Sequence, residues 1–392
     1  MNQKRLKEEE ENFTSFSSSD DSNNMKKRKM NIKEIILESN SLLLNNCIHL
    51  KLIDLYHPHF GNEHDQHLWI HHLNEKLCTH MRSKIRNRRP FSMNFQLVHS
   101  LGKKEKNKKK SCQDLGNPMD VKISYNQRVI VVTDNFNDRL VVFDLDSYRF
   151  KTSLFIRSLY PKYICIEENY MGESNDALIC NSDYDREIFK CDLKKLLHEN
   201  IKNSSTAADS FIEPYIPGHL WTTRITSSTR GIAVNKGLVF ACDPGDKSIK
   251  VLDSSNGVFI RRVTALNGLP SSVDVTNDDQ MIVTSLFENT THVYFLSRQD
   301  NGEWEVVKIV HLKDVHGPST VIYDTVSNHL LLTNELSNSI LVTNKEGSIV
   351  TTFSSYGPGE GELQTPVGLC LNIQSGELLV CSLDNGSVEI FK

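Results

Sequence analysis

Residues 129–144 read VIVVTDNFNDRLVVFD, and this stretch decides the fold of the chain. Two apolar runs flank a polar segment, and each run is short and rich in β-branched residues, as strands are. A small residue, Thr133, and an acidic residue, Asp134, end the first run. The pattern predicts two antiparallel strands joined by a short turn.

The same pattern returns five more times before the end of the 392-residue chain. Alignment of the six copies gives one column of small residues and a second column of residues that can bond a turn backbone. The first column contains Thr133, Cys180, Cys242, Thr284, Thr333 and Cys381, and the second contains Asp134, Asn181, Asp243, Ser285, Asn334 and Ser382. Neighbouring members of the first column lie 42 (284−242) to 62 (242−180) residues apart, as expected for blades of about four strands. The sequence therefore predicts an all-β, six-bladed propeller, with the small residues where neighbouring blades converge.

The fifth copy shows the expected strands of one blade. They span residues 319–324, 329–334, 340–344 and 348–353. These segments are almost continuously apolar, which indicates burial on both faces, as occurs when sheets stack around an axis.

Several copies resemble the NHL repeat, whose pattern contains Val-Ala-Asp at the second strand, Asn-His-Arg-Ile at the turn and Val-Phe-Asp at the third strand. The first copy has Val132-Thr133-Asp134, Asn137-Asp138-Arg139-Leu140 and Val142-Phe143-Asp144 at these places. The third and sixth copies also match well, whereas the second, fourth and fifth are degenerate. The resemblance implies an NHL-type β-propeller that takes up most of the chain, and it implies no particular activity.

The two ends of the repeat region predict how the ring closes. The last copy has only three strands, which would leave one sheet edge unpaired. Residues 95–101, FQLVHSL, form a single strand-like run before the first copy. We expect this run to pair with the final strand and close the ring. The alternative is an unrelated N-terminal strand.

The chain divides into three regions by composition. Residues 1–30 are charged and Ser-rich, which predicts disorder. Residues 31–90 form a His-rich segment with a pattern that is partly helical, and residues 91–392 form the propeller. An insertion at 193–221, between blades two and three, begins with a helix-like run at 193–200. Long insertions on rigid scaffolds often bind partners, although scaffolds also tolerate them without function, so Trp221 is a candidate contact residue.

Charge is distributed unevenly along the chain. Residues 1–114 contain 21 Lys or Arg and 14 Asp or Glu, a net of +7, whereas residues 115–392 contain 24 and 35, a net of −11; together these give −4. An acidic propeller disfavours binding to nucleic-acid phosphates. The basic run at 103–110 is an exception, and it is either a solvated loop, a contact for an acidic partner or phosphate, or a nuclear-import signal. The candidate partner-binding residues of the propeller are Lys103, Lys104, Lys108, Lys109, Lys110, Asn137, Asp138 and Arg139.

The sequence shows neither a membrane span nor a secretory signal. No apolar run approaches the roughly 18 residues of a membrane span, and the first residues, MNQKRLKEEEENF, lack the apolar core of a secretory signal. Nine cysteines without a CxxC pair suit a reducing compartment. We therefore expect an intracellular, cytoplasmic protein that does not bind membranes, or a nuclear one if the basic runs direct import.

Catalytic and metal-binding motifs are not evident. The chain has no nucleophile elbow, phosphate-binding glycine loop or HExxH motif. Eight histidines between His49 and His80 suggest zinc, but their spacing does not pair as zinc ligands usually do. We therefore predict no catalytic residue, no cofactor and no metal. The three column cysteines are expected to pack as small apolar residues.

These observations favour a non-catalytic protein-binding scaffold or substrate-recognition propeller. Three alternatives follow from the NHL resemblance. The chain could be a substrate adaptor in ubiquitin ligation that lacks a RING domain, or an RNA-binding regulator. It could also be a lyase or hydrolase with a metal ion in the central channel. Neither the partner nor the oligomeric state can be deduced from these patterns.

Overall fold

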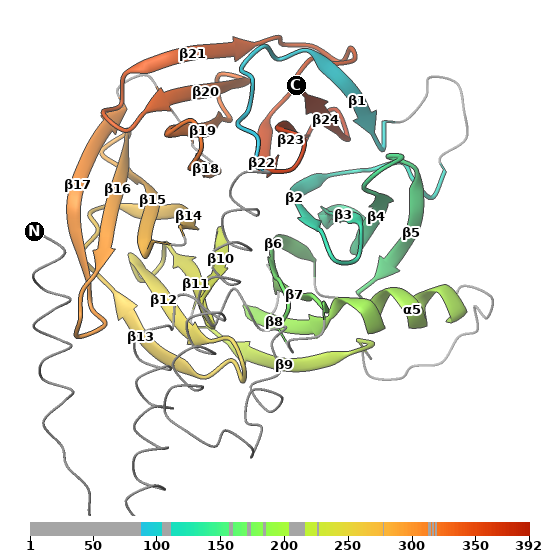
Figure 1. The fold of residues 1–392 in the computed structure, drawn as a ribbon, viewed down its shortest axis with the longest axis horizontal. Coiled ribbons are helices and arrows are strands. Elements are labelled where there is room, and N and C mark those ends of the chain that lie inside the picture. The colour runs from blue at the N-terminus through green and yellow to red at the C-terminus, as the bar shows by residue number, and fades with distance from the viewer. Residues whose placement is uncertain are drawn as a thin grey trace, which may run out of the picture. The chain divides into compact units, whose positions relative to one another are not determined.

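A computed structural model describes residues 88–392 except 104–110, 157–159, 171–173, 183–185, 204–215, 226, 277, 313–314, 316 and 318–319. The predicted disordered tail, and the predicted His-rich segment up to residue 87, lie outside these residues. Six four-stranded antiparallel sheets are arranged as blades around a central axis (Figure 1). The predicted all-β, six-bladed propeller is therefore confirmed.

The strands of the first three blades follow one another in sequence. Blade one contains β2 (Pro118–Ser124), β3 (Val129–Asp134), β4 (Arg139–Asp144) and β5 (Phe150–Phe155). Blade two contains β6 (Pro161–Glu167), β7 (Ala177–Ser182), β8 (Glu187–Asp192) and β9 (His219–Arg224). Blade three contains β10 (Ile232–Asn235), β11 (Leu238–Asp243), β12 (Ser248–Asp253) and β13 (Phe259–Val263).

The remaining blades repeat the arrangement, and blade six combines both ends of the propeller. Blade four contains β14 (Leu269–Val275), β15 (Gln280–Phe287), β16 (Thr290–Arg298) and β17 (Trp304–Leu312). Blade five contains β18 (Val321–Asp324), β19 (His329–Asn334), β20 (Ser339–Asn344) and β21 (Ile349–Ser354). Blade six contains β22 (Pro366–Asn372), β23 (Glu377–Ser382), β24 (Ser387–Phe391) and β1 (Leu97–Leu101).

The core lies between the blades. Every residue of β3 and β7 is buried, whereas the outermost strands, such as β21, alternate between exposed and half-buried residues. Six clusters of buried apolar side chains fill the six boundaries between neighbouring blades. Each blade is covered by a neighbouring blade on both faces. This explains why the inner strands are apolar at successive residues and do not alternate between apolar and polar.

The ring closes as the sequence predicts. Strand β1 pairs with β24, and the backbone of Gln96 exchanges two hydrogen bonds with that of Lys392. Phe95 stacks on Phe353 with the ring centroids 4.6 Å apart, and it also contacts Phe391 edge-on. The last blade therefore obtains its outer strand from the N-terminal side of the repeats.

Two threonines of the small-residue column join their blade to the next. Thr133 Oγ1 accepts a hydrogen bond from the amide of Asp120 (2.8 Å) and donates one to the carbonyl of Lys162 in blade two (2.9 Å). Thr333 makes the equivalent bonds to Thr320 and to Val367 in blade six. These residues lie on the second strand of each blade, so their hydroxyl groups bond the first strand of the neighbouring blade.

The predicted register of blade two is wrong by one residue. Pro161 pairs with Ser182, as Pro118 pairs with Asp134 and Pro366 with Ser382. The column member in blade two is therefore Asn181, which accepts from the amide of Tyr163 (2.6 Å) and donates to the carbonyl of Thr229 in blade three (2.8 Å). Cys180 instead belongs to the buried cluster between blades one and two.

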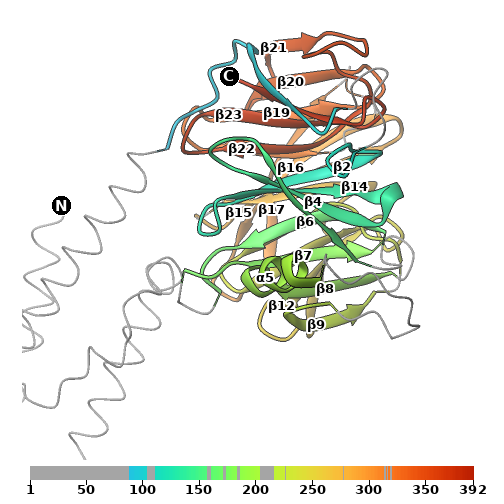
Figure 2. The same ribbon diagram turned by 90° about the vertical axis from the view of Figure 1, so that its right-hand side faces the viewer.

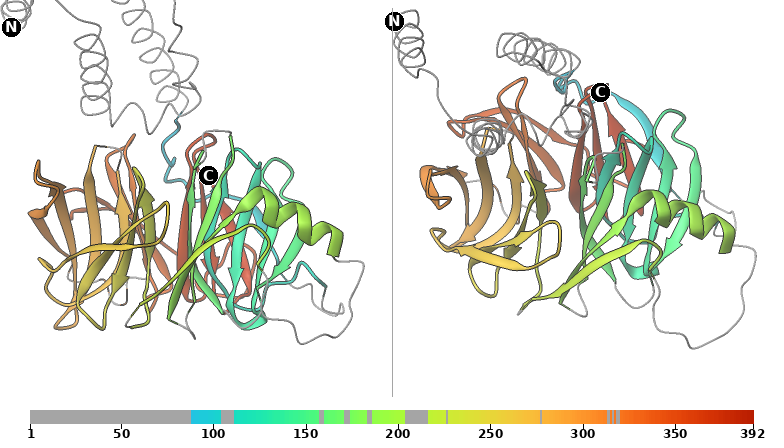
Figure 3. Two further views of the ribbon diagram at one scale, coloured as in Figure 1. Left: turned by 90° about the horizontal axis from the view of Figure 1, so that it is seen from below. Right: turned by 60° about the horizontal axis from the view of Figure 1, so that its bottom comes forward.

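The predicted insertion lies within blade two and not between blades two and three. Helix α5 (Leu193–Asn203) follows β8 directly, and β9 at residues 219–224 completes the same sheet. Leu193 and Leu196 pack into the cluster between blades one and two, which places α5 beside β5, β7 and β8 (Figures 2 and 3). Among the described residues, no helix is long and apolar enough to cross a membrane.

Candidate functional site

Two regions of the propeller carry unusual side chains. One is the loop face, which we define as the turns between the second and third strands together with the connections between blades. The strands alternate in direction within each blade, and the first strand of every blade starts at the same side of the ring. These turns and connections therefore all lie on that side. The other region is the central channel, which is lined by the first strand of every blade. Of the predicted contact residues, Lys103 and those at 137–139 belong to the loop face.

Arg139 lies on the loop face, but its side chain is buried. Its Nε donates to Asp134 (2.9 Å), Nη1 to the carbonyl of Cys112 (2.8 Å) and Nη2 to that of Asp114 (2.6 Å). The side chains of Arg139 and Asp134 are 6% and 0% exposed. The guanidinium group therefore fixes the connection into blade one, and its side chain is not presented to a partner.

The neighbouring turn residues are also used within the chain. Asn137 donates to Asp134 (2.7 Å), and Asp138 accepts from the amide of Tyr160 in the connection to blade two (2.8 Å). Both residues are half-buried. The Asn-Asp-Arg turn at 137–139 therefore has a structural role in blade one, because its side chains bond the turn to the connections before and after the blade.

Lys103 is half-buried and borders a cleft of about 960 Å³ between blades six and one. Ser100, Tyr148 and Glu360 also border this cleft. Lys104, Lys108, Lys109 and Lys110 lie outside the described residues. The contact predicted for this basic run stays a prediction.

Trp221 is not a surface residue. It is 6% exposed, belongs to the cluster between blades two and three, and its Nε1 donates to the carbonyl of Ser254 (2.9 Å). A Cβ atom at Gly257 would lie 2.5 Å from the indole ring, so that position has room only for glycine. Trp221 thus fixes β9 to blade three, which corrects its assignment as a contact residue.

Exposed apolar side chains do occur on the loop face. Phe136, in the 3-10 turn Asn135–Asn137, is 76% exposed, and Leu336 is 72% exposed. Each lies two residues beyond the second-column residue of its blade, and Phe287 has the same place in blade four with 37% exposure. Tyr356, between blades five and six, is 68% exposed. These side chains come from different blades on the same side of the ring, which makes them candidates for a shared binding surface.

The central channel contains an ion pair. Lys122 Nζ donates to Asp120 Oδ1 (2.6 Å) and to the carbonyls of Val121 (3.1 Å) and Leu369 (3.2 Å). Asp120 also accepts from the amides of Val121 (2.9 Å) and of Ile164 in blade two (3.0 Å). Burial lowers the pKa of Lys122, but the Asp120 carboxylate and the neighbouring Cys370 and Cys381 together raise it by more, so the lysine stays charged.

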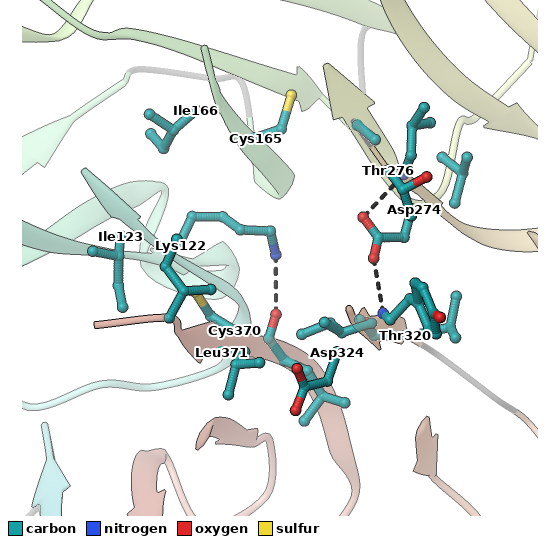
Figure 4. Close-up of a pocket in the computed structure, with 18 of the residues that line it drawn as sticks. Lys122, Ile123, Cys165, Ile166, Asp274, Thr276, Thr320, Asp324, Cys370 and Leu371 are labelled. Carbon is teal, nitrogen blue, oxygen red and sulfur yellow. Dashed lines mark hydrogen bonds between the residues drawn. The ribbon is translucent and has the colours of Figure 1, made fainter. Parts of the chain in front are cut away.

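Asp274 extends into the same channel from the opposite blade. Lys122 and Asp274 occupy the same position of the first strand in blades one and four, four residues after Pro118 and Pro270, which pair with the second-column residues. Figure 4 shows both side chains within the channel, on different sides of it. Asp274 accepts from the amides of Val275 (2.9 Å) and Tyr323 (2.9 Å) and forms no ion pair with any described residue. Burial raises its pKa, and the two amides together with the more distant charge of Lys122 offset this only in part.

The channel forms a cavity of about 340 Å³. Its walls include apolar side chains from all six blades, with Arg88, Arg89 and Glu168 also bordering it. Backbone bonding from Arg89 to Ile373 (2.8 Å) holds the N-terminal side of the propeller beside the turn between β22 and β23. The cavity is thus open at the side of the ring opposite the loop face.

The channel charges were not predicted, although the sequence contains a signal for them. The first strands read PMDVKIS in blade one and LPSSVDV in blade four, so a charged residue interrupts each apolar strand at the same position. Among the described residues, no group of three or more His, Cys, Asp or Glu side chains could hold a metal ion. The His49–His80 cluster lies outside those residues.

The described cysteines are buried, with the exception of Cys112, and none forms a disulfide. Burial raises the pKa of Cys370 to about 11, and it raises the pKa of Cys242 and Cys381 further. Thiols of this kind are unreactive at neutral pH and pack as small apolar groups.

Comparison with known proteins does not assign a family. No protein-family model and no curated protein sequence matches the chain. Two solved structures are similar in fold. Hydrazine synthase from Kuenenia stuttgartiensis has 10% identity and a TM-score of 0.49, over 71% of this chain and 77% of that chain. The computationally designed Ika8 protein has 11% identity and a TM-score of 0.41, over 70% of each chain. The NHL resemblance therefore stays a prediction, and what is established is the six-bladed propeller.

Proposed function

We propose that this chain is a non-catalytic, NHL-like scaffold whose propeller binds another protein through the loop face. The observation that carries the proposal is the exposure of Phe136 and Leu336 at equivalent turn positions of two blades. Aromatic side chains such as Phe are enriched at protein interfaces, and a few well-packed residues supply most of the binding energy.

The rigidity of the scaffold supports this proposal. The turn that carries Phe136 is held by Arg139, Asn137 and Asp138, all of which bond within the chain. A partner can therefore bind the exposed ring without first ordering the loop, which reduces the entropic cost of association.

The charge of the propeller separates this proposal from its main rival. The net charge of −11 in residues 115–392 disfavours a surface that binds RNA phosphates. An adaptor role in ubiquitin ligation fits within the proposal as a special case, because an adaptor also binds a protein substrate.

Affinity capture tests the proposal. The full chain and the double variant F136S/L336S are used as baits, with and without RNase, and captured proteins are identified by mass spectrometry. Partners that survive RNase are then purified and titrated against both baits. We expect the double variant to bind a direct partner at least about 30-fold more weakly, which corresponds to one interface hot spot of about 2 kcal/mol.

A matched control uses apolar residues that are exposed elsewhere. Phe259 is 48% exposed at the start of the outer strand β13, and Ile349 is 54% exposed at the start of β21, both at the side of the ring opposite the loop face. The variant F259S/I349S should bind as the wild type does. Equal binding by the loop-face variant, or capture that disappears with RNase, would contradict the proposal.

A further inference from the structure

The charges in the central channel do not balance. Asp120 is neutralised by Lys122, whereas Asp274 has two amide donors and no cationic partner among the described residues. All three protons of Lys122 already have acceptors, namely one carboxylate and two carbonyls. Lys122 is therefore committed to its own side of the channel and does not pair with Asp274.

An uncompensated carboxylate is costly in such a place. Asp274 is half-buried, and the part of it that is exposed faces the cavity rather than the outer surface. A buried charge without a partner costs several kcal/mol unless it is neutralised. A charged side chain that stays accessible within a cavity is therefore a candidate for ligand binding.

The surroundings of Asp274 indicate the chemistry of a ligand. Each carboxylate oxygen accepts one amide proton, which leaves lone pairs free to accept hydrogen bonds from the channel. Ile123, Ile166 and Ile322 provide apolar walls. The cavity of about 340 Å³ lies at the small end of the range for ligand pockets.

We propose that the central channel binds a small organic ammonium ion, whose N–H groups donate to Asp274 and whose apolar part packs on the isoleucine walls. Two other ligand classes fit less well. A calcium or magnesium ion needs about six oxygen ligands, and no group of three or more acidic, His or Cys side chains among the described residues could hold a metal ion. An anion would meet four carboxylates in the cavity wall, Asp120, Glu168, Asp274 and Asp324, against three cationic side chains, of which Lys122 is already paired.

This site is independent of the loop face. It opens on the opposite side of the ring, beside Arg88 and Arg89. The channel can therefore bind its ligand whether or not a protein partner occupies the loop face, and the two proposals fail separately.

The test compares amines with carboxylic acids of similar shape on the full-length wild-type chain. The probes are tyramine and n-hexylamine, with 3-(4-hydroxyphenyl)propionate and hexanoate as acids of similar shape. Binding is measured by saturation-transfer NMR and by isothermal titration calorimetry. We expect at least one amine to bind at one site per chain and neither acid to bind. Absence of binding by both amines, or binding of acids as tight as that of amines, would overturn the proposal.

A variant locates the site. Asp274→Asn removes the charge and keeps the size of the side chain, and it should weaken amine binding by about 10- to 100-fold. Asp253→Asn is the control, because Asp253 is a carboxylate on an outer turn that also accepts backbone and hydroxyl hydrogen bonds. The Asp253→Asn variant should bind the amines as tightly as the wild type does. Unchanged binding by Asp274→Asn, confirmed as folded by its thermal transition, would place the amine elsewhere and overturn the assignment.

Discussion

The hydroxyl group of Ser100 donates a hydrogen bond of 2.8 Å to Oε1 of Glu389, although the two residues are 289 positions apart in the chain. They are direct partners in the pairing of β1 with β24. Glu389 is fully buried, and it also accepts from the hydroxyl of Ser387 (2.8 Å) and the amide of Gly361 (3.3 Å). One carboxylate thus joins the first strand, the last strand and the connection from blade five to blade six.

Ser100→Ala should lower the free energy of unfolding by about 1.5–3 kcal/mol, because it removes a hydrogen bond to a buried charged group. Urea unfolding followed by tryptophan fluorescence measures this change. Ser255→Ala is the matched control: its hydroxyl donates to Asp253 in an exposed turn, where water can replace it. The control should lose less than about 0.5 kcal/mol. An equal decrease in the free energy of unfolding in the two variants would show that the Ser100–Glu389 bond stabilises the fold no more than an exposed bond does.

A chain that begins at Gly116 should lose cooperative unfolding. It lacks β1 and the buried residues Leu101 and Leu115, so β24 becomes an open sheet edge and the cluster between blades six and one is incomplete. A chain that begins at Arg88 keeps β1 and should melt as the full chain does in differential scanning calorimetry. Closure by β1 would be unimportant for stability if both shortened chains melted at the same temperature.

Arg139→Ala should destabilise the fold by about 3–5 kcal/mol, since it leaves the buried carboxylate of Asp134 without a counter-charge. Arg139→Lys should recover only part of this loss, because an ammonium group cannot reach both carbonyl acceptors as the planar guanidinium does. Chemical unfolding of the wild type, Arg139→Ala and Arg139→Lys measures the free energy of unfolding of each.

Arg128 provides the comparison for this series. Its ion pair with Asp146 is exposed, with side-chain exposures of 48% and 60%. Arg128→Ala should therefore change stability by less than about 1 kcal/mol. If Arg139→Ala cost no more than this, Asp134 would have to be stabilised by its amide donors alone.

The sequence predicted the fold well because a repeated pattern gives the same information six times. Strand order, blade number and ring closure depend on spacing and apolar runs, which the alignment shows directly. The error in blade two arose because Cys180 and Asn181 are both acceptable in a column defined by size. What selects Asn181 is its pair of bonds to Tyr163 and Thr229, which only the three-dimensional arrangement reveals.

The candidate site was harder to predict for a different reason. A charged residue in a turn is usually exposed, yet Arg139 is drawn inward by Asp134 and two carbonyls. Lys122 and Asp274 lie 152 residues apart (274−122) and share a channel only because six blades close into a ring. Local sequence patterns cannot show that two distant residues lie in the same channel. The charged residue within each apolar strand indicates only that its position is unusual.

Asp192 should make a pH-dependent contribution to stability as the N-cap of α5. Its Oδ1 accepts from the amide of Lys195 (2.8 Å), and its Oδ2 accepts from Tyr170 (2.7 Å) and Asn175 (2.9 Å). Burial would raise its pKa, but these donors lower the pKa by more. The ionised carboxylate therefore stabilises the folded state above its unfolded pKa of about 3.9.

Asp192→Ala should cost about 1–2 kcal/mol at pH 7. The difference from the wild type should shrink as the pH falls below about 4, since the unfolded carboxyl group takes up its proton first and the native one follows at lower pH. Urea unfolding at several pH values measures the difference. A difference that stayed constant down to pH 3 would mean that the charge of Asp192 does not contribute.

Thr333 and Thr343 allow the same substitution to be compared at two buried sites of blade five. Both residues are 0% exposed, on the neighbouring strands β19 and β20. Thr333 Oγ1 bonds the amide of Thr320 and the carbonyl of Val367, whereas Thr343 Oγ1 has no hydrogen-bond partner among the described residues. Valine has nearly the shape of threonine, so the exchange isolates the hydroxyl group.

Thr333→Val should lower the free energy of unfolding by about 2–4 kcal/mol, because it leaves a buried amide and a buried carbonyl unpaired between blades five and six. Thr343→Val should instead raise it by about 1 kcal/mol, because it removes a polar group that is buried without a partner. The two variants are compared by urea unfolding under identical conditions. A loss of equal size in both would show that the cost comes from replacing threonine in a tightly packed strand, and the column would then not act through hydrogen bonds between blades.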